Sequence, residues 1–209
     1  MSEAFTQAKP SWELTVRDFF VRFKANSETQ AEALNLKMPV IKDIQVQPGE
    51  QNKSIYASGV VYDVVAQLTE SKLGLTAVAL PAAFTDRALG TGGKGAVSYD
   101  SVTPQTEEFA CGYWAENSDG SAVYYFHPRC KLMQSNRTHK TMDQGSLPDP
   151  SVAWDIVALP TDEKVWRVRY DTGKVAAGKV PLTPEEFFLL PMDTIENIKA
   201  AADKEQDAE

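Results

Sequence analysis

The 209-residue sequence has no run of about 18 apolar residues, so it offers no candidate for a transmembrane helix. Its first ten residues, MSEAFTQAKP, lack the charged-then-apolar pattern of a secretory signal, and we expect the protein to be made and kept in the cytosol. Basic residues are also few: 21 Lys and Arg stand against 29 Asp and Glu, for a formal net charge of −8. This balance argues against a protein that grips nucleic-acid phosphates.

Cysteine and histidine are scarce, with two of each. Two cysteines fit a reducing compartment, and the strand register predicted below separates Cys111 from Cys130 by several pairs, so we expect two buried thiols and no disulfide. Cys111, His127, Cys130 and His139 could be assembled on paper into a zinc site. However, His127 and Cys130 would point to opposite faces of an extended strand, so we expect no zinc, no other metal and no cofactor.

Recognisable catalytic and nucleotide-binding signatures are missing too. Gly90, Gly92 and Gly95 satisfy G-x-G-x-x-G, but this motif follows an expected helix and precedes a strand, so no helix N-terminus would face a phosphate. Neither histidine lies in a nucleophile motif such as G-x-S-x-G. Adjacent carboxylates such as Glu107 and Glu108 are explained by solvation at a turn. We therefore predict that the protein is not an enzyme.

The sequence is rich in strand patterns, and the stretch 107–133 is the clearest. It predicts two long strands joined by a tight turn at residues 117–120, because Asp-Gly between alternating apolar residues favours a hairpin. Both faces of this hairpin carry aromatic or apolar side chains. We expect another sheet or helix to cover one face and a neighbouring subunit to cover the other. In the predicted register, three cross-strand pairs lie opposite each other: Tyr113 and Tyr124, Cys111 and Phe126, and Trp114 and Val123.

Further strands are expected on both sides of the hairpin. Pro48 and Gly49 should end the strand at 37–47 and open a polar loop over 48–59. Two strands separated by residues 161–163 should form a second hairpin, with Trp154 and Trp166 adding cross-strand aromatic contact. The predicted strands outside the first hairpin cover residues 12–23, 37–47, 59–80, which could be one strand or two, 152–160 and 164–173.

Two helices are expected. Pro81 and Gly90 bracket an Ala-rich segment as the first and the terminating residue of a short helix, which would turn Phe84, Ala88 and Leu89 toward the sheet. Near the C-terminus, the side chains at 183 and 186 have the form of a capping box, since Thr183 is followed three positions later by Glu186.

These elements predict a mainly β protein: an antiparallel β-sandwich or barrel with one short flanking α-helix and a helical C-terminal segment. We expect a flexible N-terminal arm at 1–11, a β-sandwich domain at 12–180 and a C-terminal helical extension at 181–209.

Three blocks of the chain resemble the major tail tube proteins of long, non-contractile-tailed bacteriophages. They are SIYASGVVYD with the strand after it and LPAAFTDRALG, the hairpin FACGYWAENSDGSAVYYFHPRCKL, and the pair VAWDIVALPTDEKVWRVRYD. In that family, too, a Tyr-Ala turn segment precedes a long strand, a Leu-Pro helix ending in Leu-Gly follows, and an aromatic hairpin leads to a closing pair of strands. The resemblance covers roughly residues 38–171 and leaves 1–11 and the tail after Lys179 without a counterpart.

The resemblance implies a structural virion protein that forms hexameric rings, which stack into a hollow tail tube and conduct DNA to the host cell during genome ejection. Other copies of the chain, a tape measure protein, and tail terminator and distal tail proteins would be its partners. DNA would pass without specific binding, and no membrane would be involved. The protein would be assembled in the host cytoplasm and reside in the virion tail. An acidic inner wall that repels phosphates would be consistent with the net charge.

The segment 48–62 is the candidate for contacts between subunits or rings, with an ordinary surface loop as an equal alternative. Other classes stay open: a tail-end connector or adaptor, an injection-system tube protein that forms single rings, or a soluble binding module. The candidate contact residues are Ile55, Tyr56, Ala57, Ser58, Gly59, Val60, Val61 and Tyr62.

Overall fold

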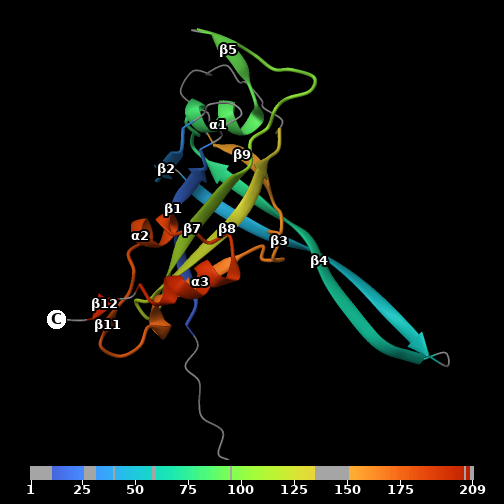
Figure 1. Ribbon diagram of the computed structural model, residues 1–209, viewed down its shortest axis with the longest axis vertical. Coiled ribbons are helices and arrows are strands. Elements are labelled where there is room, and N and C mark those ends of the chain that lie inside the picture. The colour runs from blue at the N-terminus through green and yellow to red at the C-terminus, as the bar shows by residue number, and fades with distance from the viewer. Residues whose placement is uncertain are drawn as a thin grey trace, which may run out of the picture.

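The computed structural model of the protein describes residues 11–25, 32–39, 41–57, 60–94, 96–134, 151–204 and 206–207, with the backbone alone described at 50–57, 60–68, 94 and 206–207. One antiparallel sheet of eight strands forms its frame (Figure 1), in the order β2-β1-β7-β8-β9-β4-β3, with β10 also paired to β8. The strands are β1 Glu13–Phe23, β2 Leu34–Met38, β3 Ile41–Ala57, β4 Val60–Ala77, β7 Phe109–Asn117, β8 Ala122–Leu132, β9 Val152–Ala158 and β10 Val168–Asp171.

Short elements complete the fold. Two small ladders join β5 (Gly92–Lys94) to β6 (Val97–Tyr99) and β11 (Lys179–Val180) to β12 (Gln206–Asp207). The α-helices are α1 Ala82–Leu89, α2 Pro184–Leu189 and α3 Ile195–Ala202, and a 3-10 turn η1 covers Thr172–Lys174. Within the described part of the chain, none of the helices is long and apolar enough to cross a membrane. The prediction of a mainly β, antiparallel protein with one flanking helix and a helical C-terminal segment is confirmed.

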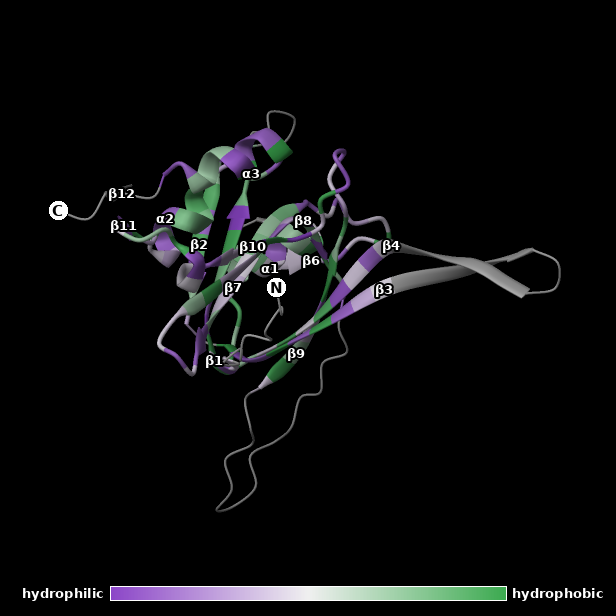
Figure 2. Ribbon diagram, turned by 90° about the horizontal axis from the view of Figure 1, so that it is seen from below, coloured by the Kyte–Doolittle hydropathy of each residue, from purple (hydrophilic) through white to green (hydrophobic). Residues whose placement is uncertain are grey.

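The main core lies inside the curve of the sheet, where β1 and β7 face β4 and β9 (Figure 2). Helix α1 closes one end of this core as predicted: Phe84 and Ala88 are fully buried and Leu89 packs against the same cluster. Phe84 meets the ring of Phe109 edge-on at 5.1 Å. The main core contains Phe19, Val21, Phe23, Met38, Leu73, Leu75, Ala77, Phe84, Ala88, Phe109, Cys111, Tyr113, Cys130, Leu132, Trp154, Ile156 and Ala158.

A second core covers the opposite face of hairpin β7–β8. Helices α2 and α3 lie on this face, and Phe188 of α2 stacks on Phe20 of β1 with ring centroids 4.3 Å apart. The predicted capping box of α2 is confirmed, since the Thr183 hydroxyl accepts from the Glu186 N–H at 3.3 Å and the Glu186 carboxylate accepts from the Thr183 N–H at 2.9 Å. The second core contains Phe20, Tyr124, Phe126, Val168, Leu182, Phe187, Phe188, Met192 and Ala201.

The expectation that a neighbouring subunit covers one face of the hairpin is therefore wrong. The C-terminal segment of the same chain covers it, because its aromatic pair Phe187 and Phe188 supplies apolar area that the strand-based prediction left out. Both faces of β7–β8 are thus buried within one molecule.

The predicted hairpin exists, but its register is off by one residue. The loop holds three residues, since the Asn117 N–H donates to the Ser121 carbonyl at 2.8 Å and Gly120 adopts φ +83°. Such a loop ends with a residue in the left-handed region, which glycine adopts without strain. Because of the extra residue, the observed cross-strand pairs differ from the predicted ones. They are Tyr113 with Tyr125, Trp114 with Tyr124, Ala115 with Val123, and Cys111 with His127.

The second predicted hairpin is wrong. Strand β9 pairs with β4 and with the end of β8, whereas β10 pairs with residues 123–126 of β8. The two strands follow one another along β8 because β8 is longer than either. Trp154 lies opposite Leu75 of β4, and Trp166 contacts the ring of His127 at 5.6 Å.

The strand predicted at 37–47 and the loop predicted at 48–59 also need correction. The first is split into β2 and β3, and β3 continues without interruption to Ala57. Pro48 is tolerated because β3 is an edge strand, where a missing N–H need not break a ladder. Next to it, a register shift at Gly49 and Glu50 marks a bulge, and a Cβ on Gly49 would lie 2.7 Å from the Glu70 carbonyl oxygen.

Candidate functional site

The feature of the fold that most suggests function is an arm formed by the far halves of β3 and β4. Residues 71–77 of β4 pair with β3 on one side and with β9 on the other. At residues 60–70 of β4, β3 is the only strand paired with it in the described part of the chain. The arm projects from the body (Figure 1), and eleven extended residues give it a reach of roughly 35 Å.

Side-chain hydrogen bonds join β4 to β3 at the base of the arm. The Thr69 hydroxyl donates to the Gly49 carbonyl at 3.2 Å, and the Ser71 hydroxyl donates to the Gln47 carbonyl at 3.3 Å. Ser71 is fully buried, so this end of the arm belongs to the packed body. These contacts fix where the arm leaves the sheet.

The predicted contact residues lie at the tip of this arm. The backbone of 55–57 ends β3 and that of 60–62 begins β4. The pairs Tyr56 with Val61 and Ala57 with Val60 close the ladder. Ser58 and Gly59 lie outside the described residues, as do the side chains of all eight candidates. The sequence contained a usable signal: Ser-Gly between two β-rich runs is typical of a hairpin turn.

A two-stranded ribbon that projects from the body is a candidate surface for contact with a partner. An isolated hairpin is marginally stable in water, and each of its outer edges presents unpaired backbone N–H and C=O groups. Another polypeptide that pairs with such an edge can supply hydrogen bonds to these groups, so the arm is a candidate surface for contact.

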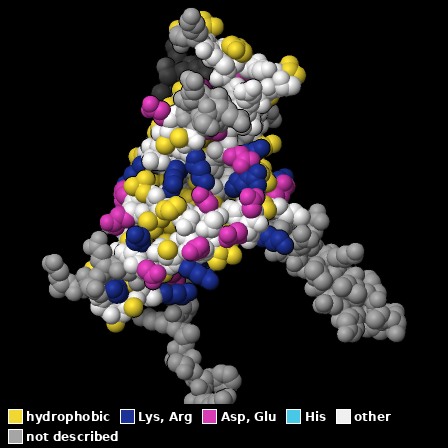
Figure 3. Space-filling model, viewed as in Figure 1, with side chains coloured by type: hydrophobic (Ala, Val, Ile, Leu, Met, Phe, Trp, Pro, Cys, Tyr) yellow, Lys and Arg dark blue, Asp and Glu magenta, His cyan; other side chains and the backbone are white. Residues whose placement is uncertain are grey.

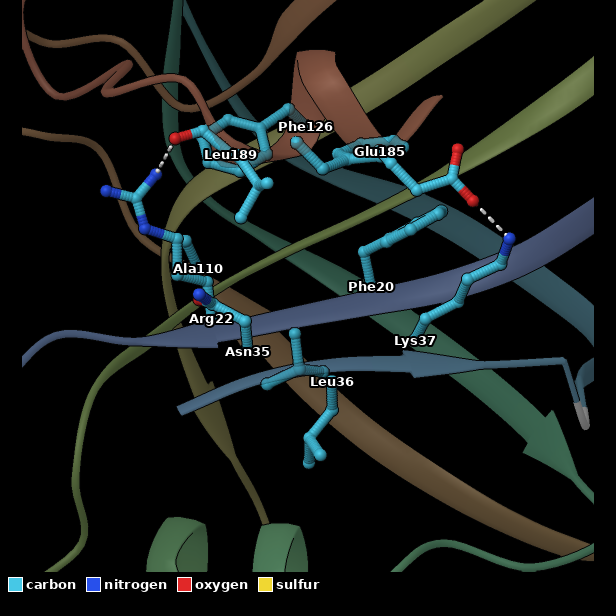
Figure 4. A pocket seen from close by; sticks show the side chains of 11 residues that line it. Phe20, Arg22, Asn35, Leu36, Lys37, Ala110, Phe126, Glu185 and Leu189 are labelled. Carbon is cyan, nitrogen blue, oxygen red and sulfur yellow. Dashed lines mark hydrogen bonds and ion pairs between the residues drawn. The ribbon is translucent and has the colours of Figure 1, made fainter. Parts of the chain in front are cut away.

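The opposite edge of the sheet, β2, adjoins a small apolar cavity of about 160 Å³ (Figure 4). Arg22 donates to the carbonyls of Leu189 and Leu190 at 2.9 Å, and Lys37 pairs with Glu185 and, at 3.2 Å, with Asp18. The hydrogen bond to Glu185, with that to Asp18, raises the pKa of Lys37. Pockets for drug-sized molecules usually exceed about 300 Å³, so the size of this cavity suits an apolar side chain or a group of similar size.

Large apolar side chains are exposed at several further places in the described part of the chain, and at two of them more than one lies close together in the sequence. Trp12 and Leu14, at the start of β1, are 63% and 62% exposed. Val97 and Tyr99 of β6 and Val102 beyond it are exposed as well. Apolar side chains left in water in this way are candidates for contact surfaces.

Charges of both signs are interspersed over the face seen in Figure 3. Glu108 accepts from Arg129 at 2.6 Å and lies 3.3 Å from Lys131, and the hydrogen bond from Arg129 holds its pKa below the usual range. Glu107 forms a two-point ion pair with Arg87, at 2.6 and 2.7 Å. Solvation at a turn, the explanation expected for these two carboxylates, is therefore wrong.

The two cysteines lie much closer than predicted. Cys111 and Cys130 are free thiols with sulfurs 3.4 Å apart. The reason is a register shift: Cys111 lies opposite His127 and Cys130 opposite Phe109, so β8 carries one extra residue between them. The residue after His127 is Pro128, which cannot donate to the ladder and is typical of a bulge.

This proximity does not create a metal centre. Among the described residues, no group of three or more His, Cys, Asp and Glu side chains is placed to hold a metal ion, and His139 lies outside them. His127 is fully buried, its Nδ1 lies 3.2 Å from the Trp166 carbonyl oxygen, and burial lowers its pKa to about 4. A neutral imidazole in this position is part of the packed interior.

The glycine motif has the context predicted for it. Gly90, at φ +69°, ends α1, and Gly92 begins β5, while Gly95 lies outside the described residues. The helix precedes the motif in the chain, so the motif does not open a helix. In comparisons with known proteins, no protein-family model and no curated protein matches the chain.

Proposed function

We propose that this chain is a structural virion protein whose copies form hexameric rings that stack into a phage tail tube and conduct DNA to the host cell. The resemblance of residues 38–171 to major tail tube proteins suggests the type of assembly. The observation that carries the proposal is the projecting arm β3–β4, whose tip holds the predicted contact residues.

The distribution of covered and uncovered surface supports contact through arm and edges. Both faces of hairpin β7–β8 are buried within the molecule, so they offer little to a neighbour. By contrast, the sheet ends in β2 on one side and β3 on the other, and the arm extends beyond β9, the strand of the body that pairs with β4. Head-to-tail contacts between such edges close into a ring when the rotation between copies is right.

The proposed partners follow the resemblance: copies of this chain, a tape measure protein, and tail terminator and distal tail proteins. DNA would pass through the lumen without specific binding. The net charge of −8 is compatible with this passage, because an acidic wall repels phosphates.

Negative-stain electron microscopy of the concentrated protein tests the proposal. Stacked rings would support a tube protein, and isolated rings would support a tail-end connector or a single-ring injection-system protein instead. A protein that stays monomeric at high concentration would contradict both.

A substitution at the arm tip tests the site separately. We expect Tyr56→Asp to prevent stacking while leaving the melting temperature of the subunit unchanged, because a charge at an assembly contact must be desolvated without a partner. Tyr56→Phe, which keeps the ring, should still form tubes. Normal tubes from Tyr56→Asp would reject the role of this residue.

A further inference from the structure

We propose that Cys111 and Cys130 form a latent disulfide: a peroxide converts this buried thiol pair into an intrachain bond that staples β7 to β8. The proposal concerns the folded subunit and is independent of the proposed function.

The geometry of the pair carries the proposal. The two sulfurs lie 3.4 Å apart, and a disulfide bond of about 2.05 Å requires them to approach by only about 1.4 Å. The bulge in β8 brings them together, since Cys111 lies opposite His127 while Cys130 lies opposite Phe109. The bond therefore calls for rotation of the two side chains and a small local shift of the strands to bring these diagonal neighbours together, without a change of register.

The surroundings make the bond strictly intrachain. Cys111 is 1% and Cys130 0% exposed, so a thiol on another molecule cannot reach either sulfur in the folded state. Both strands are central, because β7 pairs with β1 and β8 pairs with β9 at these positions. Burial raises the pKa of Cys130, which suppresses the reactive thiolate, and the reaction should be slow and limited by local opening.

A small peroxide is the oxidant that suits this site. One thiolate attacks a peroxide oxygen, the O–O bond breaks, and the products are a sulfenic acid and, after protonation, water. The second thiolate then attacks the sulfenic sulfur, which forms the S–S bond and releases the second water. In sum, the two thiols lose two protons and two electrons, and hydrogen peroxide takes these up and is reduced to two waters.

Closing the bond should stabilise the fold. The two cysteines are 19 residues apart in the sequence, and a cross-link over such a loop restricts the unfolded chain. For a protein of this size we expect the melting temperature to rise by about 5–10 °C, and dithiothreitol should reverse the rise.

The experiment is incubation of the full-length protein with hydrogen peroxide, followed by intact-mass measurement, non-reducing peptide mapping and thermal melting. We expect a loss of about 2 Da, a single Cys111–Cys130 cross-linked peptide and the higher melting temperature. Free thiols that persist on denaturation after prolonged treatment would overturn the proposal. So would interchain dimers, oxidation to sulfinic or sulfonic acid as the main product, or a cross-link that fails to raise the melting temperature.

Cys111→Ala and Cys130→Ala are the matched controls. Each removes one sulfur, and neither variant should show the gain in melting temperature on peroxide treatment; a gain in either variant would contradict the assignment. If a variant fails to fold, the comparison of oxidised wild type with the same sample after dithiothreitol decides alone, since reversal of both mass and melting temperature is required.

Discussion

Two glycines determine the register of hairpin β7–β8 and the packing of the C-terminal helices on it. Gly120 supplies the left-handed backbone that a three-residue loop needs, and the loop length sets the register. Gly112 leaves space for the C-terminal helices: a Cβ there would lie 2.2 Å from Phe188 Cε1 and 2.7 Å from the Tyr125 carbonyl oxygen. The second core therefore depends on the absence of one methyl group.

We expect Gly112→Ala to lower the free energy of unfolding by about 1–3 kcal/mol, because Phe188 must move out of its place in the second core. The matched control is Gly74→Ala in β4, where the nearest atom, Gln45 Cβ, lies 3.8 Å from the added Cβ. Urea denaturation of both variants checks the difference. If the two variants are equally stable, the second core accommodates the added methyl group without loss of unfolding free energy.

His127 makes stability depend on pH. Its pKa is lowered by burial to about 4 in the folded protein, whereas an unfolded histidine titrates near 6.5. The unfolded state therefore binds the proton first, so stability is complete above pH 6.5 and falls progressively as the pH drops toward 4. Between pH 7 and pH 5 this amounts to a loss of about 2 kcal/mol.

His127→Gln should remove this dependence, since glutamine does not titrate and keeps an N–H donor for the Trp166 carbonyl. Urea denaturation at pH 7 and pH 5 provides the comparison. The pKa values of Glu108 and Glu185 are lowered in the folded state from an ordinary value of 4.5, so these carboxylates lose their contribution as the pH falls below about 4.5, outside the interval from pH 7 to pH 5. A variant with the pH dependence of the wild type would exclude His127 as its source.

Residue-level register was the part of the fold that sequence patterns predicted least well. The DG turn located the hairpin, but choosing between a two-residue loop at 118–119 and a three-residue loop at 118–120 depends on whether Gly120 begins the second strand or ends the loop. The bulge after His127 likewise moved Cys130 next to Cys111. One residue in either place changes every pair beyond it, and apolar alternation alone does not reveal such an insertion.

At the scale of elements, existence and type were predicted better than pairing. Helix α1, the capping box of α2 and the strands β1, β4, β7 and β8 follow from local signals, because caps and periodicity act over a few residues. The partners of β9 and β10 depend on the long strand β8, which competes successfully with the local hairpin. Long-range competition of this kind is invisible in a local pattern.

Helix α1 is held over the end of the core by one arginine. Besides its two bonds to Glu107, Arg87 donates to the carbonyls of Glu32 at 2.6 Å and Lys24 at 2.9 Å, and its guanidinium lies 4.5 Å from the Phe23 ring centre. Only 15% of this side chain is exposed. The contacts tie α1 to both ends of the segment between β1 and β2.

We expect Arg87→Lys to cost about 2 kcal/mol of unfolding free energy, because an ammonium cannot reproduce the planar, multi-point contact. Arg169→Lys is the matched control: its side chain is 52% exposed and lies 3.7 Å from Asp171, so the change should stay within about 0.5 kcal/mol. Thermal melts of both variants decide. If Arg87→Lys behaves like the control, the arginine does not hold the helix.

On the scale of the whole molecule, the protein consists of a packed body and a two-stranded arm that projects from it. The body buries both faces of its central hairpin, one inside the curved sheet and one beneath α2 and α3. The arm leaves the body where β9 stops pairing with β4, at Ser71. Folding and assembly are therefore expected to depend on different parts of the chain.

Shortening the arm should separate the two. The pair Gln51 with Gln67 gives a natural joining point, so residues 52–66 can be replaced by an Asn-Gly turn that suits a two-residue hairpin loop. Because the strand pairs of the removed part, as far as the described residues show them, lie within the arm, we expect the protein to keep its melting temperature to within about 4 °C, the effect of roughly 1 kcal/mol. Stacked rings should disappear, as measured by sedimentation velocity and electron microscopy.

A second variant controls for the altered turn itself: Ser58→Asn, which makes the sequence at 58–59 Asn-Gly, keeps the length of the arm and should still give stacked rings. Tubes formed by the shortened protein would place the stacking contacts elsewhere on the body. A shortened protein that unfolds would instead show that the arm stabilises the body that carries it. Only loss of stacking from a folded subunit fits a molecule in which an unsupported pair of strands is completed by the next copy.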